Sequence, residues 1–317
     1  MKSVCSKGVR IMSKTVDKLA KKKIRLSSED KIMYTIVYII IALFMIIVLY
    51  PLIFVVSSSF SSGAAVSAGR VLLWPVDFST VGYQIVFAYK AVFVGYANTI
   101  FYTVVATAYN IFMTTLAAYP LARKNFQGRG IYMTLFMITM FISGGMIPSY
   151  LLIVDLGLID TRASLIIPGA LTVHNMIIMR TFFRNSIPSE LQEAAMLDGC
   201  SDIRYLLQIV IPLSKAVISV LILYYAVGHW NAYFGALLYL RDQNKFPLQL
   251  ILRSILIATT TTDLTQIQSA DAQAAMQSAS ESMRYALIVV STAPILAVYP
   301  FVQKHFAKGV MIGSVKG

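Results

Sequence analysis

The chain has 317 residues, of which 57% are hydrophobic and only 13% are charged, and its mean hydropathy is +0.71. A soluble domain is about one-quarter charged, so this composition excludes an ordinary soluble globular protein. A net charge of +13 would favour nucleic-acid binding in a soluble protein, but 10 of the 27 Lys and Arg residues lie in the first 31 positions, where membrane topology explains them. Two cysteines, Cys5 and Cys200, are too few for a disulfide framework or a Cys-rich metal site.

Six apolar segments are long enough to cross a bilayer. A helix needs roughly 20 mainly apolar residues to cross a hydrocarbon core of about 30 Å, and only helices satisfy the backbone of such segments in lipid. The sequence therefore predicts an all-α membrane protein with six transmembrane helices. We expect them at residues 32–56, 93–119, 131–154, 164–183, 213–240 and 285–302.

The distribution of basic residues predicts the orientation. With these six spans, 20 Lys and Arg residues lie on the side that holds both termini and 7 lie on the other side. Basic residues are enriched in cytoplasmic segments, so both termini are expected in the cytoplasm. The first apolar run is longer than the roughly 7–15 residues of a signal-peptide core, so we expect the first span to stay as an anchor.

The chain divides into a basic N-terminal segment (1–31), a transmembrane domain (32–303) and a C-terminal tail (304–317). Two long stretches are expected on the outer side. The first, 57–90, carries Trp74-Pro75 and is expected to pack as a small cap. The second, 241–284, has a polar portion that is either a solvated loop or a surface for an extracytoplasmic partner.

The predicted spans lack the groups that ion-driven carriers and enzymes use. All 14 acidic residues lie outside the spans, although Asp155 lies at the end of one. Buried ionisable groups in spans mark proton relays and ion sites, so a self-contained ion-gradient carrier is disfavoured, and a membrane scaffold remains a further alternative. No GxxxxGK[ST] phosphate loop occurs, and metal ligands do not cluster. We expect no catalytic residue, no metal site and no cofactor in this chain.

The most informative segment is the cytoplasmic stretch 185–212, NSIPSELQEAAMLDGCSDIRYLLQIVIP. Pro188 suits the start of a helix, and acidic residues follow it where the helix dipole favours them. Gly199 can adopt the positive φ that ends a helix. A second helix is expected from Ser201-Asp202 to Pro212. The pattern predicts two short helices joined by a glycine turn.

This segment resembles the EAA loop of ABC importer permeases, and we call residues 185–212 the EAA loop. The motif in this chain is Glu193, Ala194, Ala195 and Gly199, followed by Ile211-Pro212 where the family has LP. The runs SGGMIPSYL, SLIIPGAL and WNAYF and the ending KGVMIGSVKG resemble the branch related to maltose-type permeases, and more narrowly bacterial importers of polysaccharides and complex oligosaccharides.

The resemblance implies a MetI-like permease fold in the bacterial cell membrane. The chain would form half of the pathway for a sugar, together with a second, homologous permease, two ATPase subunits that bind ATP and Mg, and an extracytoplasmic solute-binding protein; nucleic acid is not an expected partner. The EAA loop would dock on the ATPase, and the tail from Lys308 would either reach the ATPase or be a disordered end. The resemblance assigns ATPase coupling to Glu193, Ala194, Ala195, Leu197, Asp198 and Gly199.

A sugar pathway needs uncharged hydrogen-bonding groups and aromatic faces. Such residues at membrane depth also join helices to one another, so the packing role competes with a pathway role for each of them. We favour Asn110, Asn175, Trp230 and Asn231 as pathway residues. The sequence leaves open whether the sugar is neutral, contains uronate or is a glycan fragment.

Overall fold

The computed structural model describes residues 27–261 and 278–297. These residues form helices joined by turns, and their one β-type pairing is an isolated antiparallel bridge between Ser61 and Phe78. The prediction of an all-α protein is therefore confirmed for the part of the chain that the structure describes. This part falls into two units divided after Phe54, which we describe separately.

The first unit holds most of α2 (Ser28–Ser59), a helix of 32 residues. The Ser27 backbone N–H donates to Asp30 Oδ2 at 3.1 Å, and Glu29 and Asp30 lie in the first turn, where the helix dipole favours negative charge. Its apolar side chains are exposed over the length of the unit. A helix that is apolar on every side is typical of a membrane span, so α2 confirms the helix predicted at 32–56.

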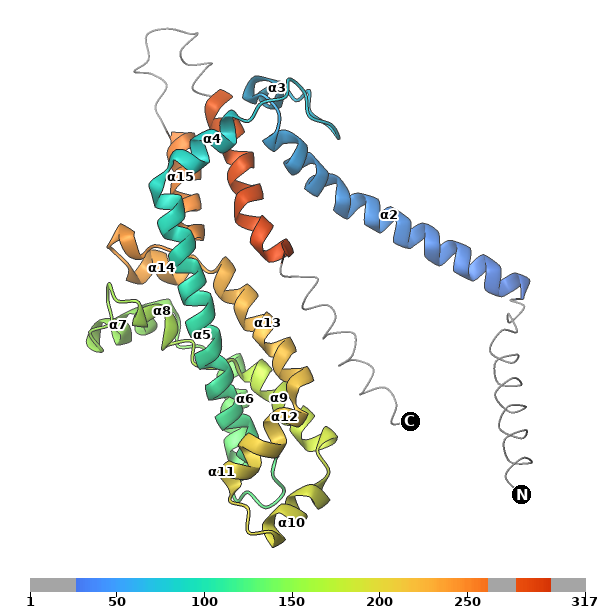
Figure 1. Ribbon diagram of the computed structural model, residues 1–317, viewed down its shortest axis with the longest axis vertical. Helices are drawn as coiled ribbons and strands as arrows, with labels where there is room; N and C mark the ends of the chain where they lie inside the picture. Colours follow the sequence, from blue (N-terminus) through green and yellow to red (C-terminus); the bar gives the residue numbers. More distant parts are fainter. Residues whose placement is uncertain (1–26, 262–277, 298–317) are drawn as a thin grey trace, which may run out of the picture. The chain divides into compact units, whose positions relative to one another are not determined.

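The second unit is organised around α5 (Lys90–Ala122), which confirms the helix predicted at 93–119. Figure 1 shows α13 (Lys215–Asn231) running along α5, and α9 (Val173–Ser186) also packs against it. A helix of 33 residues is about 50 Å long, so α5 connects the two ends of this unit. It is the element to which most other helices attach.

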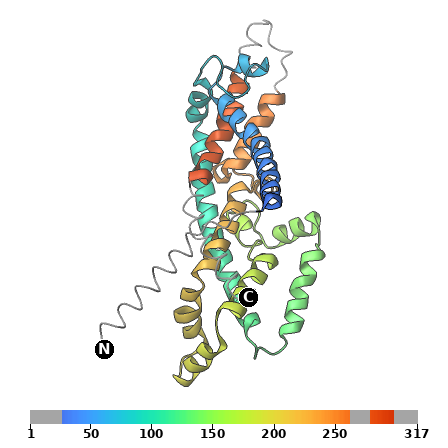
Figure 2. The same cartoon turned by 90° about the vertical axis from the view of Figure 1, so that its right-hand side faces the viewer.

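The helix predicted at 131–154 is not continuous. The structure has α6 (Arg129–Phe141) and α7 (Met146–Asp155), bent by 113° at the break between them (Figure 2). Gly145 lies in this break with φ +87°. Glycine adopts positive φ without the steric penalty of a side chain, so Gly145 allows the sharp turn that the apolar periodicity did not indicate.

The helix predicted at 164–183 is also interrupted. A single turn, α8 (Ala163–Ile166), is followed by the non-helical residues 167–172 and then by α9. Pro168-Gly169 lies in this gap. Proline removes a backbone donor and glycine disfavours the helix, so the local sequence weakens the helix here.

The fifth predicted helix, 213–240, ends early. Helix α13 stops at Asn231, and the separate α14 (Phe234–Tyr239) follows. Before α13, the segment Asp202–Leu213 makes an angle of 81° with it. This bend lies at Ser214, two residues after Pro212, so the EAA loop joins α13 through a corner.

The stretch 241–284, predicted to face outward, contains a helix that the sequence did not predict. A 3₁₀ turn (Gln243–Lys245) precedes α15 (Leu248–Thr261), which buries Leu248, Leu250, Ile251 and Leu252. A Cβ atom on Gly95 of α5 would lie only 2.6 Å from Ile251 Cδ1, so the missing side chain lets α5 and α15 pack closely. Residues 262–277, which hold most of the polar portion, lie outside the described residues.

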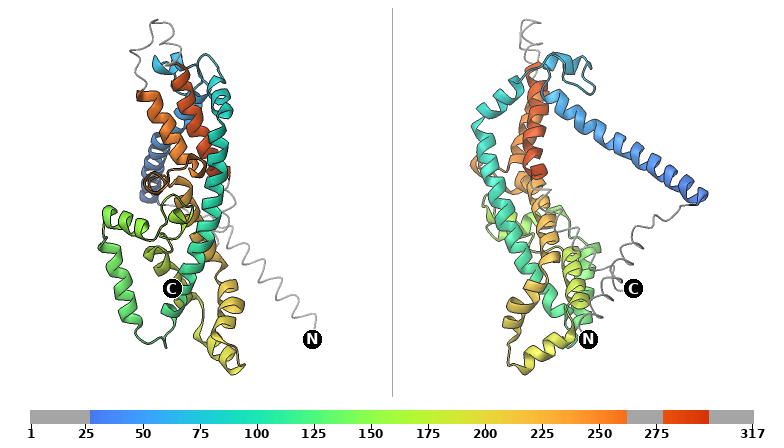
Figure 3. Two further views of the ribbon diagram at one scale, coloured as in Figure 1. Left: turned by 90° about the vertical axis from the view of Figure 1, so that its left-hand side faces the viewer. Right: turned by 45° about the vertical axis from the view of Figure 1, so that its right-hand side comes forward.

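The last described helix covers residues 278–297 and begins before the predicted start at 285, while the predicted end lies outside the described residues. It packs with α4 (Val81–Ala88) and α5, as Figure 3 shows for the upper part of the unit. A Cβ atom on Gly82 would collide with the Ser282 carbonyl oxygen. The buried residues joining these helices are Val86, Val92, Leu248, Leu252, Met283, Ala286 and Leu287.

The stretch 57–90 folds around serine side chains at the end of α2. Ser57 Oγ donates to the Leu73 carbonyl oxygen at 2.7 Å, and Ser61 Oγ accepts from the Val76 N–H at 3.0 Å. Helices α3 (Gly63–Ser67) and α4 flank this loop. Trp74, singled out in the sequence, is 80% exposed at the surface of the loop.

Two described helices, α2 and α5, are long and apolar enough to cross a membrane, and the number rises to four if each bent pair is one span. The fold class is therefore confirmed, while the number of six spans stays a prediction.

Candidate functional site

The EAA loop forms the helix, glycine turn and second helix that the sequence predicts. Helix α10 (Ser189–Leu197) begins after Pro188, whose extended backbone occupies the N-cap position, and Glu190 lies in its first turn. Proline cannot donate a backbone hydrogen bond and acidic residues suit the positive end of the dipole, so the start of α10 is determined locally.

The end of α10 is a Schellman motif around Gly199. The Cys200 N–H donates to the Ala195 carbonyl oxygen at 2.9 Å, and the Gly199 N–H donates to the Met196 carbonyl oxygen at 3.0 Å. Gly199 has φ +72°, which this motif requires and which glycine adopts most easily. The turn at Gly199 therefore ends α10 and changes the direction of the chain before the next helix begins.

The second helix of the loop is irregular. Ser201 Oγ accepts from the Arg204 N–H at 3.4 Å and caps α11 (Asp202–Tyr205). A π-helical segment, Leu206–Val210, and α12 (Ile211–Leu213) continue it to Pro212. Single π turns inside helices frequently occur at functional sites.

The predicted coupling residues differ in exposure. Ala195 is 8% exposed and lies in the protein interior, while Leu197 at the end of α10 is 90% exposed. The other four, Glu193, Ala194, Asp198 and Gly199, are exposed. Large apolar side chains exposed beside them are Leu191, Met196 and Ile203. Clustered exposed apolar side chains mark interaction surfaces, so α10 presents a mixed acidic and apolar surface.

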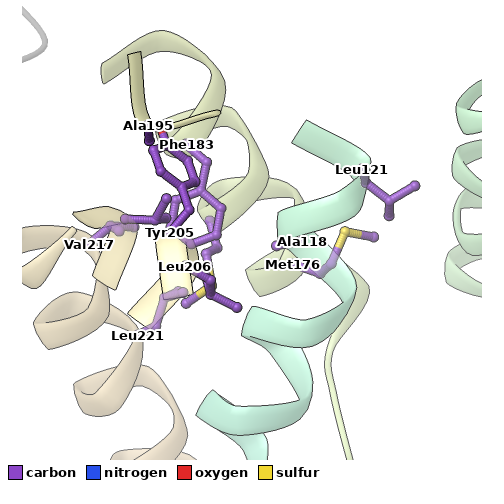
Figure 4. Packing of buried hydrophobic residues seen from close by; sticks show 11 residues of the cluster. Ala118, Leu121, Met176, Phe183, Ala195, Tyr205, Leu206, Val217 and Leu221 are labelled. Carbon is purple, nitrogen blue, oxygen red and sulfur yellow. The ribbon is translucent and has the colours of Figure 1, made fainter. Parts of the chain in front are cut away.

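A buried cluster connects the EAA loop to the long helices. Figure 4 shows Ala195 beside Phe183 of α9 and Tyr205 of α11. The cluster continues into α5 and α13, so the loop rests on the same helices that form the body of the unit. Its buried members are Ala118, Leu121, Met176, Met179, Phe183, Ala195, Tyr205, Leu206, Val210, Val217 and Leu221.

A second polar site lies at the break between α8 and α9. Asn110 of α5 has no exposed surface, and its Nδ2 donates to the carbonyl oxygens of Gly169 and Ala170, the latter at 2.9 Å. Its Oδ1 contacts His229 Nε2 of α13 at 2.6 Å. These side chains satisfy backbone groups that lipid could not, so Asn110 holds the non-helical segment in place.

Tyr225 of α13 completes this arrangement. Its hydroxyl oxygen accepts from the Thr172 N–H at 3.1 Å and lies 2.8 Å from Thr114 Oγ1 of α5. The sequence indicated Asn110 but did not identify Tyr225 and His229 as its hydrogen-bonding companions. The Pro168-Gly169 pair inside an apolar run was the available signal, because a broken span needs polar side chains from its neighbours.

The hydrogen bonds of the other predicted pathway residues do not belong to this network. Asn175 is 6% exposed in α9, and Trp230 is 9% exposed with Nε1 donating to the Ser291 carbonyl oxygen at 3.2 Å. Asn231 is exposed, and its Nδ2 donates to the Val227 carbonyl oxygen at 2.9 Å. Among the hydrogen bonds of the described residues, none joins the four predicted residues to one another. Their contact with a sugar stays a prediction.

Apolar segments that are interrupted between α6 and α7 and between α8 and α9, together with a surface loop that has the EAA pattern, indicate a membrane transport protein. Residues 110–312 match the family model described as binding-protein-dependent transport system inner membrane component. This match spans more than half of the chain, so the protein belongs to the inner-membrane permeases of binding-protein-dependent ABC transporters.

Similar proteins agree with this family. The chain is 43% identical to Protein LplC of Bacillus subtilis (strain 168), over 86% of this chain and 90% of that protein. It is 39% identical to the polygalacturonan/rhamnogalacturonan transport system permease protein YtcP of the same strain, over 91% of this chain and 100% of that protein. A crystal structure of a bacterial ABC transporter involved in the import of the acidic polysaccharide alginate contains a similar chain, with a TM-score of 0.79 and 36% sequence identity. The similarity covers 90% of this chain and 100% of that chain.

Proposed function

We propose that this chain forms half of the transmembrane pathway of an ATP-driven importer for an oligosaccharide or polysaccharide fragment. Two similar proteins support this substrate class, since one is named for polygalacturonan/rhamnogalacturonan transport and the other takes part in alginate import. Both similarities extend over about nine-tenths of this chain. The named polysaccharides favour an acidic sugar over a neutral one.

The proposed complex contains this chain, a second homologous permease, two ATPase subunits and an extracytoplasmic solute-binding protein. The ATPase subunits bind ATP and Mg, and this chain contributes no catalytic residue. Lys and Arg are in excess on the side that holds both termini and the EAA loop. This excess supports a cytoplasmic location for the two termini and for the loop.

The observation that carries the proposed mechanism is the exposed surface of α10. Glu193 and Leu197 are exposed, so a partner can pair with the carboxylate and cover the leucine. The small Ala194 side chain permits close approach. Closure of the ATPase dimer around ATP would move α10, and the cluster under Ala195 would pass this movement to α9 and α13.

In the proposed pathway the four predicted residues have different roles. Asn110 acts through the backbone of 167–172, because its amide is already bonded within the chain. Asn231 is exposed, while Asn175 and Trp230 become accessible when the helices separate during alternating access. The pathway surface would thus change as the transporter opens to each side.

The test has two parts. The tagged chain is purified from its native membrane in mild detergent with an acidic oligosaccharide mixture present, and mass spectrometry identifies what accompanies it. We expect an ATPase, a second permease and a bound oligosaccharide containing uronate. Uptake of labelled oligosaccharide and ATP hydrolysis are then measured in proteoliposomes for the recovered complex.

The variants Glu193→Lys and Gly199→Arg should hydrolyse ATP without transport while still reaching the membrane. Gln127→Lys is the matched control, because Gln127 is exposed on the loop after α5 and lies outside the EAA loop. Recovery of the chain alone, together with normal uptake by both EAA variants, would contradict the proposal and favour an ion-gradient carrier or a scaffold.

A further inference from the structure

The cytoplasmic end of α5 carries an arginine that bonds to the EAA loop. Arg123 follows the last residue of α5, and its side chain is only 15% exposed. Its guanidinium pairs with the Asp202 carboxylate at the start of α11. Its Cζ lies 5.3 Å from the centre of the Tyr119 ring, and the Tyr119 hydroxyl donates to the Asp202 carbonyl oxygen at 3.2 Å. Asp202 is therefore held through both its side chain and its backbone.

The same guanidinium reaches α10. With the Gln192 amide oxygen assigned to face Arg123, that oxygen accepts from Nε at 3.3 Å and from Nη2 at 2.5 Å. The five N–H donors of a guanidinium lie in one plane and can serve two acceptors at once. Arg123 thus bonds to Gln192 of α10 and to Asp202 of α11 at the same time.

Gln192 and Asp202 lie on opposite sides of the Gly199 turn. A Cβ atom at Gly199 would meet no other atom within 4 Å, so packing at the turn itself does not set the angle between α10 and α11. Ala195 is the buried residue of α10. Besides the packing of Ala195, the contacts of Arg123 therefore hold α10 at its angle to α11 and to α5.

The backbone around Arg123 is anchored to other helices. Arg180 Nε of α9 donates to the Leu121 carbonyl oxygen at 2.9 Å, and Arg129 Nη1 of α6 donates to the Arg123 carbonyl oxygen at 3.4 Å. The last carbonyl groups of a helix have no partner within it. The two arginines satisfy them, so the end of α5 is a fixed base for the Arg123 side chain.

We propose that Arg123 is a positioning residue that makes α5 move together with the EAA loop during transport. This inference rests on the proposed function, in which the ATPase moves α10. A displacement of α10 or α11 is passed through Arg123 to α5, which is continuous from Lys90 to Ala122. Helix α5 carries Asn110 to the break at 167–172, so the movement reaches the centre of the permease.

Coupling is measured as labelled sugar transported per ATP hydrolysed by the complex in proteoliposomes. In Arg123→Gln and Asp202→Asn this ratio should fall about tenfold, within the usual range of coupling between sites, while both permeases and the ATPase still purify together. Arg123→Lys should give a ratio between those of Arg123→Gln and the unchanged protein. An ammonium can pair with Asp202, but it lacks the planar donors that also bond to Gln192. Lys124→Gln is the matched control, with the same loss of charge at the next, exposed position.

A distance measurement separates positioning from simple stability. Spin labels are placed at Lys124→Cys and Glu190→Cys, two exposed positions outside the predicted coupling residues, in a Cys5→Ser, Cys200→Ser background, in the complete complex. We expect the distance between the labels to stay the same with and without a non-hydrolysable ATP analogue when Arg123 is present, and to change with the analogue in Arg123→Gln.

The outcomes distinguish this inference from the function on which it rests. If Glu193→Lys uncouples transport but Arg123→Gln keeps the full ratio or the same fixed distance, the role of Arg123 is overturned and the proposed function stands. If Glu193→Lys also transports normally, the proposed docking of α10 fails, and the role of Arg123 fails with it.

Discussion

Asn110 of α5 and His229 of α13 share a hydrogen bond of 2.6 Å beside the break between α8 and α9. Because Asn110 Nδ2 is used for the carbonyl oxygens of Gly169 and Ala170, Oδ1 is the atom that faces the histidine. His229 Nε2 is then the donor. One side chain thus joins α5 and α13 to the non-helical residues 167–172.

Asn110→Ala should destabilise the protein. It leaves the carbonyl oxygens of Gly169 and Ala170 and the donor of His229 without their partner, and an unsatisfied buried polar group costs about 1–3 kcal/mol. We expect a loss of that size in the free energy of unfolding, measured by denaturant titration in detergent. Asn231→Ala is the control, because that side chain is exposed and bonds only within its own helix. An equal loss in both variants would show that the break needs no support from α5.

Gly82→Ala should disturb the packing of the helix at 278–297. The added methyl group meets the Ser282 carbonyl oxygen, and overpacking of this kind costs about 1–3 kcal/mol. Gly130→Ala is a close match, since both glycines are the second residue of a helix and a Cβ at Gly130 meets nothing within 4 Å. The control should be neutral or slightly stabilising, because alanine favours the helix. Thermal unfolding of the two variants gives the comparison, and equal unfolding temperatures would contradict the close packing.

The loops that hold Asp160 and Arg241 should respond to acid through the Asp160 carboxylate. Its carboxylate accepts from the N–H groups of Asp242 and Arg241, both at 3.1 Å, and pairs with Lys245 at 3.2 Å. These N–H groups, and then Lys245, lower the pKa of Asp160 below its ordinary value of 3.8. The folded state therefore binds this proton less readily than the unfolded chain.

The stabilising effect of Asp160 is complete above pH 3.8 and is lost as the pH falls through its lowered pKa. Hydrogen exchange at the Arg241 and Asp242 amides, corrected for the intrinsic rate, should show protection that disappears in this acidic range. In Asp160→Asn the protection should be weaker and independent of pH there. Protection that persists unchanged in the variant would assign it to other contacts of the loop.

Gly199→Ala should loosen the end of α10, whereas Gly199→Asn should be tolerated better. A positive φ costs an ordinary residue about 1–2 kcal/mol, and asparagine visits this region more readily. The Schellman hydrogen bonds of Cys200 and Gly199 report the effect directly. Their amides should exchange several-fold faster in Gly199→Ala than in Gly199→Asn, because a difference of about 1 kcal/mol in the free energy of opening the turn changes the exchange rate several-fold. Equal exchange in the two variants would mean that the turn tolerates another backbone geometry.

The sequence by itself determined the elements that depend on local chemistry. The apolar runs were long enough to define α2 and α5 without knowledge of any neighbour, because helices satisfy their own backbone in lipid. Pro188 and Gly199 determined where α10 begins and ends, because each restricts the backbone at its own position. The EAA pattern then indicated the family to which the chain belongs.

Only the tertiary structure decided where the long apolar segments break and what holds the breaks. The interruptions at 142–145 and 167–172 lie within runs that read as continuous helices, and α15 lies within a stretch expected to be a loop. The partners that support them are distant in the chain, as Asn110 is from Gly169 and as Gly95 is from Leu248. Hydropathy records how well a segment suits lipid, but the free energy of a broken span depends on polar groups and close contacts supplied by other helices.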